Sequence, residues 1–410
     1  MKKVVGVVAV PKKASKKSEE GITTESKLTN LVESLVFSDD FYINMAIYAI
    51  LEVPQELYFG MASEKNINLL ETVTLSIDVH ENGNIIRNEV KKPYFSPTKQ
   101  RGIERRAIAY SLVKTSDGKC IPYYKYFNLS IDVTKTYQDG KPDPRDILTY
   151  LWGATWTAPV AYLRGRIHYG GGVAIQPLLE RKQRNRVEYN MYNMLKSEEE
   201  SEKEKREKGK EIAQTIWTKE YVEPYTLIPV VRYGTLLGVN NMEPHAMAYA
   251  FLEGLKLAGA GTPKGISILE DYWLGNKESN KKYNEKEEKK EENKEEKKEK
   301  VLVVDVGVNL LDDPVIIPPA IPSPIDAINE FKEKAKASKN IFDRSDPDEV
   351  FSEIKSRKVC LRMVGDNAYE FLKALASKFV SEYLMKIDSL DIPRVRKSKE
   401  LGGSAEAGKS

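Results

Sequence analysis

The sequence predicts an α+β fold in which helices cover one face of an antiparallel sheet. Three observations favour this class. Strand-like and helix-like segments alternate along most of the chain. A helix-like segment followed by a strand, with a glycine-rich turn beside that strand, occurs twice, over 145–172 and 244–269. Two charged tracts, 196–211 and 277–300, lack an apolar stripe and are therefore expected to be insertions or loops.

The N-terminal part contains a predicted central strand and a predicted hairpin. Val4–Val10 is a β-branched run, followed by lysines where a signal peptide would have small residues. Asn30–Leu51 is mostly apolar and long enough for two short elements. Thr72–Val79 alternates as a strand does, and Glu81–Asn84 has the turn chemistry of a hairpin that leads into Ile85.

The middle of the chain continues the alternation of helix and strand. The pattern predicts a helix over Ile103–Val113 and an aromatic-rich strand over Tyr123–Val133. Asp143 and the proline after it have the composition of a helix cap, so a helix is expected over Arg145–Thr155. A strand is expected over Ala161–Ile167, ending at three consecutive glycines.

The second half repeats this order and ends in helices. We expect a strand over Tyr225–Leu237, a helix from Asn241 to Ala258, and a strand over Ile266–Leu269. Val301–Val308 is a further predicted strand. Helical periodicity then marks three segments: Ser323–Ala337, Asp346–Ile354 and Ala368–Met385.

These segments suggest a division of the chain into four parts. We expect an α+β core over 1–275 with an insertion at 196–211, a charged low-complexity linker over 276–300, a strand with a helical lobe over 301–393, and a disordered tail over 394–410.

Composition excludes several classes of protein. No stretch approaches the roughly 18 apolar residues of a membrane span. Cys120 and Cys360 are the only cysteines and there are only three histidines, so we expect no disulfide framework, no metal site and no cofactor. The scarcity of cysteine is typical of a reducing compartment, and the predicted location is the cytoplasm.

The charge is unevenly distributed along the chain. Between Lys91 and Lys196 there are 19 Lys and Arg residues against 8 Asp and Glu residues, a net charge of +11. The whole chain carries only +3, so the remainder carries −8. A basic segment within a nearly neutral protein is typical of a protein that binds a polyphosphate.

Three basic clusters lie in this segment. In the first, an extended loop is expected to lead into a helix N-terminus, which favours phosphate. In the second, strand periodicity would place Arg164, Arg166 and His168 on one face, beside glycines that let a ligand approach. The third mixes arginine with tyrosine, as in proteins that stack single-stranded bases. The candidate nucleic-acid-binding residues are Lys92, Lys99, Arg101, Arg105, Arg106, Arg164, Arg166, His168, Arg181, Lys182, Arg184 and Arg186.

The sequence contains no recognisable catalytic constellation. The glycine-rich segment Gly259–Gly265 follows a helix and precedes a strand, the reverse of the order in a phosphate-binding P-loop. Asp139, Asp143 and Asp146 leave open a metal-dependent nuclease, although aspartates beside glycine and proline are ordinary turn and cap residues. We therefore predict that the chain is not an enzyme.

With these segments in place, the chain resembles the RAMP-superfamily backbone subunits of archaeal type I CRISPR effector complexes, with subtype I-D as a candidate. The resemblance covers 1–274 and rests on the two helix–glycine–strand segments, Asp146–Gly172 and Pro244–Leu269, within a framework interrupted by charged insertions. It implies a ferredoxin-like core, similar to an RNA-recognition motif, that binds guide RNA in a basic channel. It also implies a β-hairpin thumb and copies that polymerise along the RNA.

The predicted function is therefore non-catalytic binding of single-stranded guide RNA by a repeating subunit of a CRISPR-type ribonucleoprotein in antiviral defence. The expected partners are single-stranded RNA, other subunits of the complex and further copies of this chain, without a membrane. A structural protein that assembles with itself and has no nucleic-acid activity, such as a virion component, stays open as the alternative.

Overall fold

The computed structural model describes residues 41–60, 62–64, 67–81, 84–129, 143, 145–157, 160–177, 185–190, 216–259, 263–271, 301–309, 344–357 and 361–390. The predicted strand Val4–Val10, the predicted helix Ser323–Ala337 and both charged tracts lie outside these residues.

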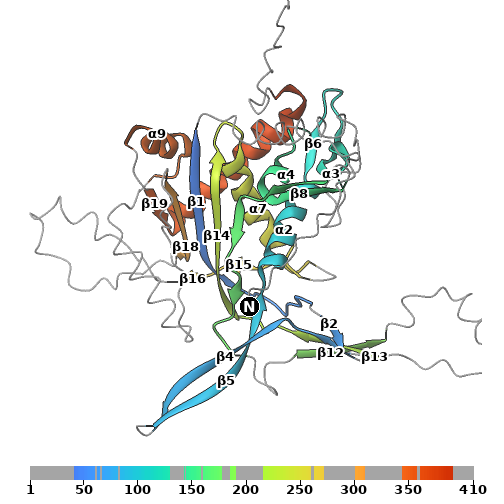
Figure 1. Ribbon diagram of the computed structural model, residues 1–410, viewed down its shortest axis with the longest axis vertical. Helices are drawn as coiled ribbons and strands as arrows, with labels where there is room; N and C mark the ends of the chain where they lie inside the picture. The colour runs from blue at the N-terminus through green and yellow to red at the C-terminus, as the bar shows by residue number, and fades with distance from the viewer. Residues whose placement is uncertain are drawn as a thin grey trace, which may run out of the picture.

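An antiparallel sheet forms the centre of the molecule (Figure 1). Its strands follow the order β10–β14–β1–β18–β19, and β15 pairs with the end of β1. The middle strand β1 is apolar along almost its whole length and is buried on both faces. The strands are β10 (Ile167–Tyr169), β14 (Leu227–Gly238), β1 (Tyr42–Glu52), β18 (Val304–Asn309), β19 (Leu361–Val364) and β15 (Ser267–Ile268).

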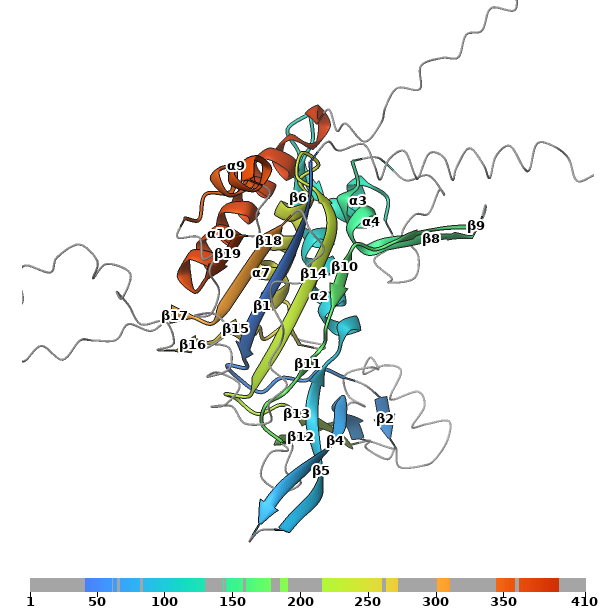
Figure 2. The same ribbon diagram turned by 60° about the vertical axis from the view of Figure 1, so that its left-hand side comes forward.

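Three helices pack side by side on one face of this sheet, which both views show (Figures 1 and 2). Alternate residues of β1, such as Met45 and Ile47, share a core cluster with these helices, whereas Tyr48 belongs to a cluster on the opposite face. The predicted α+β class is confirmed, while the ferredoxin-like arrangement stays a prediction. The helices are α2 (Pro97–Tyr110), α7 (Glu243–Lys256) and α10 (Asp366–Lys378).

A long hairpin and several short ribbons surround the central sheet. The predicted hairpin is confirmed as β4 (Thr72–Glu81) and β5 (Asn84–Phe95), and it projects away from the sheet (Figures 1 and 2). A second hairpin consists of β8 (Gly153–Thr157) and β9 (Val160–Arg164). The remaining strands are β2 (Ala62–Glu64), β3 (Ile67–Leu69), β6 (Leu112–Lys114), β7 (Cys120–Pro122), β11 (Gly172–Val173), β12 (Asn185–Asn190), β13 (Ile216–Tyr221), β16 (Glu270–Asp271) and β17 (Val301–Leu302).

The predicted strand Tyr123–Val133 is wrong in its described part. Residues Tyr123–Tyr126 form the short helix α3, which follows Pro122 and ends at Phe127. The buried ring of Tyr123 packs against Phe127, and its hydroxyl donates a hydrogen bond to Asp146 Oδ1 at 2.7 Å. Packing and this buried hydrogen bond override the high strand propensity of the aromatic residues.

The predicted helix over Arg145–Thr155 is confirmed but shorter. Helix α4 spans Ile147–Trp152, and its cap is Asp146, whose carboxylate accepts a hydrogen bond from the Leu148 backbone nitrogen. The helix ends where Gly153 takes a φ of +78°, a conformation that favours glycine. The strand β8 starts at the same residue.

The C-terminal region belongs to the central sheet and its helical layer. Strands β18 and β19 extend the sheet beyond β1, and a buried ion pair between Asp305 and Arg362 joins them. The predicted helices are confirmed as α9 (Pro347–Arg357) and α10, and the latter continues through the π-helical turn η1 (Phe379–Tyr383) and the 3-10 turn η2 (Leu384–Ser389). Residues after the charged linker thus share one core with residues before it.

None of the helices in the described residues is long and apolar enough to cross a membrane.

We predict that His245 makes the stability of the protein depend on pH. Its imidazole lies between α7 and α9, 5.8 Å from the Phe351 ring, and burial, with a smaller effect of Lys378, lowers its pKa from 6.5 to about 3. Below pH 6.5 the imidazole of His245 is therefore protonated in the unfolded chain but stays neutral in the folded protein. The free energy of unfolding consequently falls as the pH falls. Between pH 7 and pH 5 His245 lowers the free energy of unfolding by about 2 kcal/mol.

Urea unfolding at both pH values checks this prediction. From pH 7 to pH 5 the free energy of unfolding should fall by about 2 kcal/mol more in the wild type than in the variant His245→Gln, because all other titrating groups contribute equally to both proteins. An identical loss in the two proteins would show that His245 titrates normally in the folded state.

Candidate nucleic-acid interface

A buried ion pair fixes the position of helix α2. Glu104 and Arg232 are both fully buried, and the Arg232 guanidinium donates a hydrogen bond to the Glu104 carboxylate. The Tyr169 hydroxyl donates to the other carboxylate oxygen at 2.7 Å, and the guanidinium carbon lies 4.5 Å from the Phe251 ring centroid. Burial raises the pKa of Glu104, whereas Arg232 and Tyr169 lower it. The pair joins α2 to β14, β10 and α7.

Helix α2 therefore brings Arg101 to the base of the β8–β9 hairpin. The Arg101 guanidinium donates a hydrogen bond to the Trp152 carbonyl oxygen. Gly153, the next residue, pairs with Arg164 in the hairpin register. Arg101 also acts on Arg105, because burial and then the positive charge of Arg101 lower the pKa of Arg105 to about 10.

The hairpin side of this region adds the positive charge of Arg164. His168 lies on β10, and burial followed by the charge of Arg164 lowers its pKa. Both side chains are exposed, and Arg106 on α2 is half-buried. Within the described residues, no carboxylate forms an ion pair with Arg101, Arg106 or Arg164. The fold thus joins the first two predicted basic clusters, and we call these residues the α2–hairpin cluster: Arg101, Arg105, Arg106, Arg164 and His168.

Three other candidate residues are engaged within the fold. Lys92 is buried on β5 and donates to the Ile175 carbonyl oxygen at 2.8 Å, and burial lowers its pKa. Lys99 forms an ion pair with Glu71. Arg166 is 8% exposed and donates to Glu243 at 2.7 Å and to the Leu236 carbonyl oxygen at 2.6 Å.

The expected common face of Arg164, Arg166 and His168 does not form. Strand β9 ends at Arg164 and β10 begins at Ile167, so the strand is interrupted between them. A Cβ atom on Gly165 would lie 2.8 Å from the Trp152 backbone, which shows how closely the chain turns there. The turn sends Arg166 into the core while Arg164 stays exposed.

The two expected phosphate contacts of the backbone are also occupied by the protein. The N-terminus of α2 already faces a carboxylate, since Ser96 Oγ donates to Glu71 Oε2 at 2.9 Å. At Gly170, a Cβ would lie 2.4 Å from a methyl group of Val231, and at Gly171 it would lie 2.7 Å from the Tyr94 hydroxyl. These glycines therefore accommodate the sheet and the Tyr94 side chain, not a ligand.

Only part of the third basic cluster lies within the described residues. Arg181, Lys182 and Arg184 lie outside the described residues. Arg186 lies on β12, opposite Glu220 of β13 in the strand register, and its side chain is not described.

The carboxylates considered for a nuclease are engaged in the fold where the structure describes them. Asp143 accepts hydrogen bonds from Arg145, including one of 2.8 Å to its second oxygen. Asp146 caps α4 and accepts from Tyr123. Asp139 lies outside the described residues. Among the residues that are described, no group of three or more His, Cys, Asp or Glu could hold a metal ion.

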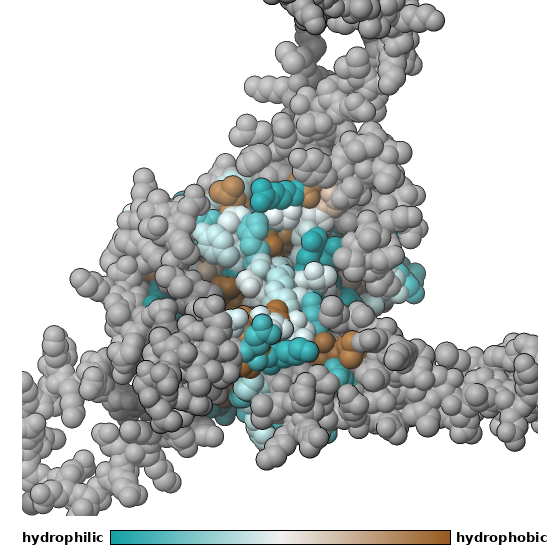
Figure 3. All heavy atoms as spheres, turned by 60° about the horizontal axis from the view of Figure 1, so that its bottom comes forward, coloured by the Kyte–Doolittle hydropathy of each residue, from teal (hydrophilic) through white to brown (hydrophobic). Residues whose placement is uncertain are grey.

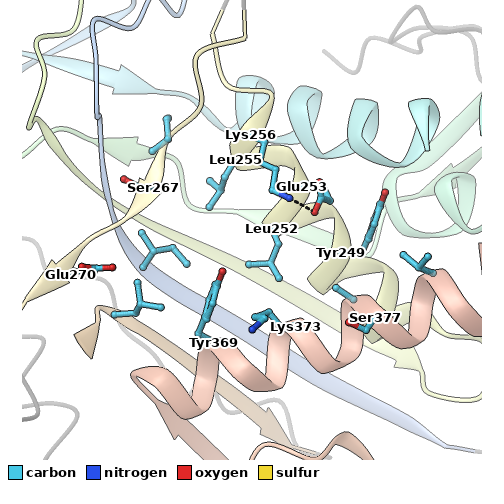
Figure 4. A pocket seen from close by; sticks show the side chains of 15 residues that line it. Tyr249, Leu252, Glu253, Leu255, Lys256, Ser267, Glu270, Tyr369, Lys373 and Ser377 are labelled. Carbon is cyan, nitrogen blue, oxygen red and sulfur yellow. Dashed lines mark hydrogen bonds and ion pairs between the residues drawn. The ribbon is translucent and has the colours of Figure 1, made fainter. Parts of the chain in front are cut away.

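A cleft of about 590 Å³ lies between α7 and α10. Figure 4 shows Tyr249 and Leu252 of α7 facing Tyr369 and Lys373 of α10 across it. Helix α7 separates this cleft from α2, because it packs against both helices. The lysines at the rim pair with glutamates, Lys256 with Glu253 at 2.6 Å and Lys373 with Glu370 at 2.9 Å. The cleft therefore lacks the unpaired positive charge of the α2–hairpin cluster.

The face at the bottom of Figure 1 has a mixed surface. In Figure 3 the described residues on this face are mostly hydrophilic, with apolar residues in small separate patches.

Comparison with known proteins gives only weak likenesses. No protein-family model and no curated protein matches the sequence. The crystal structure of Thermofilum pendens Csc2 aligns over 83% of this chain and 82% of its own, with 13% identity and a TM-score of 0.34. A structure of a Type IV-B CRISPR complex aligns over 56% of this chain and 90% of its own, with 9% identity and a TM-score of 0.29. Likenesses this weak carry no argument about the function of this chain.

The sequence carries a signal for Glu104 and Arg232, although neither is among the predicted site residues. Arg232 is the only charged residue within the apolar strand β14, and Glu104 lies on the same helix face as the apolar Ala107 and Ile108, three and four positions later. A single charge in an apolar strand requires a buried partner. Only the fold identifies that partner, because 128 positions separate the two residues.

We predict that Arg232→Met strongly destabilises the protein, because it leaves the Glu104 carboxylate buried without its cation. The expected loss in the free energy of unfolding is about 3–5 kcal/mol. Guanidinium chloride unfolding of Arg232→Met and of the double variant Glu104→Gln/Arg232→Met checks this prediction. The double variant should recover a large part of the loss, since no unpaired charge is left. Equal stability of Arg232→Met and wild type would show that the pair does not hold α2.

Proposed function

We propose that this chain binds single-stranded RNA as a non-catalytic, guide-binding subunit of a CRISPR-type ribonucleoprotein. The observation that supports the proposal best is the α2–hairpin cluster, in which two basic segments about 60 residues apart in sequence meet on one side of the fold. Cations without carboxylate partners are the groups that phosphates bind.

The cluster would bind RNA mainly through its backbone. Arg106 and Arg164 present guanidinium groups that contact phosphate oxygens, and such contacts carry no information about base sequence. Arg105 is 8% exposed, and the Nε atom of Arg101 is buried without a hydrogen-bond partner. Both arginines add positive electrostatic potential to the surface beneath which they lie. Affinity should therefore fall steeply with salt and vary little with sequence.

The resemblance of the sequence to the RAMP-superfamily backbone subunits suggests the other parts of the proposal. Copies of the chain would line up along the guide, next to other subunits of the complex. The projecting β4–β5 hairpin is the described element whose shape suits the thumb of such subunits. The remaining candidate cations of the third cluster, including Arg184 and Arg186, would extend the channel.

We predict that charge reversal of Arg106 and Arg164 weakens binding to every RNA sequence by a similar factor. Two lost phosphate contacts should reduce the slope of log affinity against log salt by about 1.4, since each contact on a single strand contributes about 0.7. The double variant Arg106→Glu/Arg164→Glu is measured with labelled single-stranded RNA at several salt concentrations.

Lys355→Glu serves as the control for the change in charge. Lys355 is an exposed residue of α9 at the opposite edge of the sheet, with its amine 5.5 Å from the Phe41 ring centroid. Its reversal should leave the salt slope unchanged. An unchanged slope in the double variant as well would show that the α2–hairpin cluster does not contact RNA.

Purification without nuclease tests the RNA-binding proposal against the structural alternative. Short RNA in a multimeric peak supports the guide-binding function. Ordered oligomers that contain no nucleic acid, and that ignore added single-stranded RNA at low salt, would favour a self-assembling structural protein.

A further inference from the structure

Tyr225 is an aromatic residue that the fold holds outside its core. It lies in the turn before β14, and 72% of its surface is exposed. Its φ angle is +65°, in the left-handed region, which is unfavourable for a bulky side chain. A strained residue that adds nothing to the core calls for an explanation outside the core.

Several hydrogen bonds hold this turn in place. The Tyr225 backbone nitrogen donates to the Val53 carbonyl oxygen at 2.7 Å, and the Val53 nitrogen donates to the Thr226 carbonyl oxygen at 3.0 Å. The Gln176 side chain bridges the turn, because its nitrogen donates to the Tyr225 carbonyl oxygen at 3.2 Å and its oxygen accepts from the Leu227 nitrogen at 2.8 Å. The backbone conformation that displays Tyr225 is therefore set before any ligand binds.

A hollow of about 210 Å³ lies beside the Tyr225 ring. It is smaller than the roughly 300–1,000 Å³ of ordinary small-molecule pockets, so it suits a single planar ring. Three prolines give it rigid apolar walls, and Glu223 is the only carboxylate among its lining residues. The full lining is Pro93, Gln176, Pro177, Glu223, Pro224, Tyr225 and Thr226.

A free cation lies close to the hollow. Side chains alternate along β5, so the exposed Lys91 lies on the same face as Pro93, about 7 Å along the strand. Lys92 between them points inward to the Ile175 carbonyl oxygen. Among the described residues, no acidic side chain forms an ion pair with Lys91.

We propose that Tyr225 and this hollow form a subsite that stacks one unpaired nucleobase of the bound RNA, with Lys91 contacting a neighbouring phosphate. The inference rests on the proposed function and adds a specific contact to it. Stacking on tyrosine needs only the flat face of a base. The Glu223 carboxylate accepts hydrogen bonds, so it favours a base with an exocyclic amino group, such as adenine or cytosine, over uracil.

The hollow fits a base better than it fits a proline-rich peptide. Peptides of that kind dock in grooves lined by several aromatic residues. Here Tyr225 is the single aromatic residue of the lining, and the prolines belong to the protein itself. If Tyr225→Gly loses binding to a proline-rich peptide and keeps its affinity for RNA, the hollow is a peptide site instead.

The variant Tyr225→Gly separates stacking from folding. Glycine adopts a φ of +65° without strain, so the variant should melt at the same temperature as the wild type or higher. Its affinity for labelled single-stranded oligoadenylate should nevertheless fall about 5- to 150-fold, the equivalent of 1–3 kcal/mol for one stacked base. Tyr225→Trp should keep the affinity. Tyr369→Ala is the control, since Tyr369 is a partly exposed tyrosine of the cleft between α7 and α10, which α7 separates from α2.

An oligonucleotide of the same length without bases completes the design. The wild type and Tyr225→Gly should bind this abasic strand equally, because only phosphate contacts are left. The preference of the wild type for oligoadenylate over oligouridylate should shrink in Glu223→Gln.

The outcomes distinguish the subsite from the function on which it rests. If the wild type binds no RNA, the proposed function and the subsite are both wrong. If the wild type binds RNA and Tyr225→Gly binds it equally well, or loses the same factor on the abasic strand, only the stacking subsite is wrong. Loss of binding to a proline-rich peptide with unchanged RNA affinity would also overturn it.

Discussion

The buried ion pair between Glu104 and Arg232 is the interaction on which the rest of this structure depends. It lies where α2, β14, β10 and α7 meet, and Tyr169 and Phe251 complete its surroundings. A buried pair of this kind adds little net stability compared with apolar residues, but it penalises every arrangement that separates the two charges. The pair therefore specifies how α2 lies on the sheet, and the direction of every other side chain on α2 follows from that.

Two further buried ion pairs work in the same way at other junctions. Arg166 with Glu243 connects the strand break before β10 to the start of α7, and Arg362 with Asp305 connects β19 to β18. The positive charge of the chain is thus divided between two roles. Some cations hold elements together, while Arg101, Arg106 and Arg164 form no ion pair with a carboxylate of the described residues and stay available to an anionic ligand.

Strand β14 connects the two regions proposed to contact RNA. Its centre carries Arg232 and supports β10, and the turn that precedes it displays Tyr225. Near its other end, Leu236 also takes a left-handed conformation, with a φ of +50° and 51% of its surface exposed. Asn44 accepts a hydrogen bond from its nitrogen, and Arg166 donates one to its carbonyl oxygen. The sheet therefore stabilises strained, exposed apolar residues at both ends of one strand.

The sequence by itself determined the fold class, the β4–β5 hairpin, the helix α7 and the segment in which basic residues gather, because apolar periodicity and charge are local properties of the chain. The helix predicted over Ile103–Val113 is correct only to Tyr110, since α2 starts at Pro97 and residues 112 and 113 belong to β6. It did not determine that Tyr123 would start a helix, since that depends on the buried hydrogen bond from its hydroxyl to Asp146, 23 positions away. Only the tertiary structure decided which cations are free. Arg164 and Arg166 look alike in sequence, but the turn at Gly165 exposes the first and buries the second against Glu243, which lies 77 positions away. Partners so distant along the chain are brought together by packing alone.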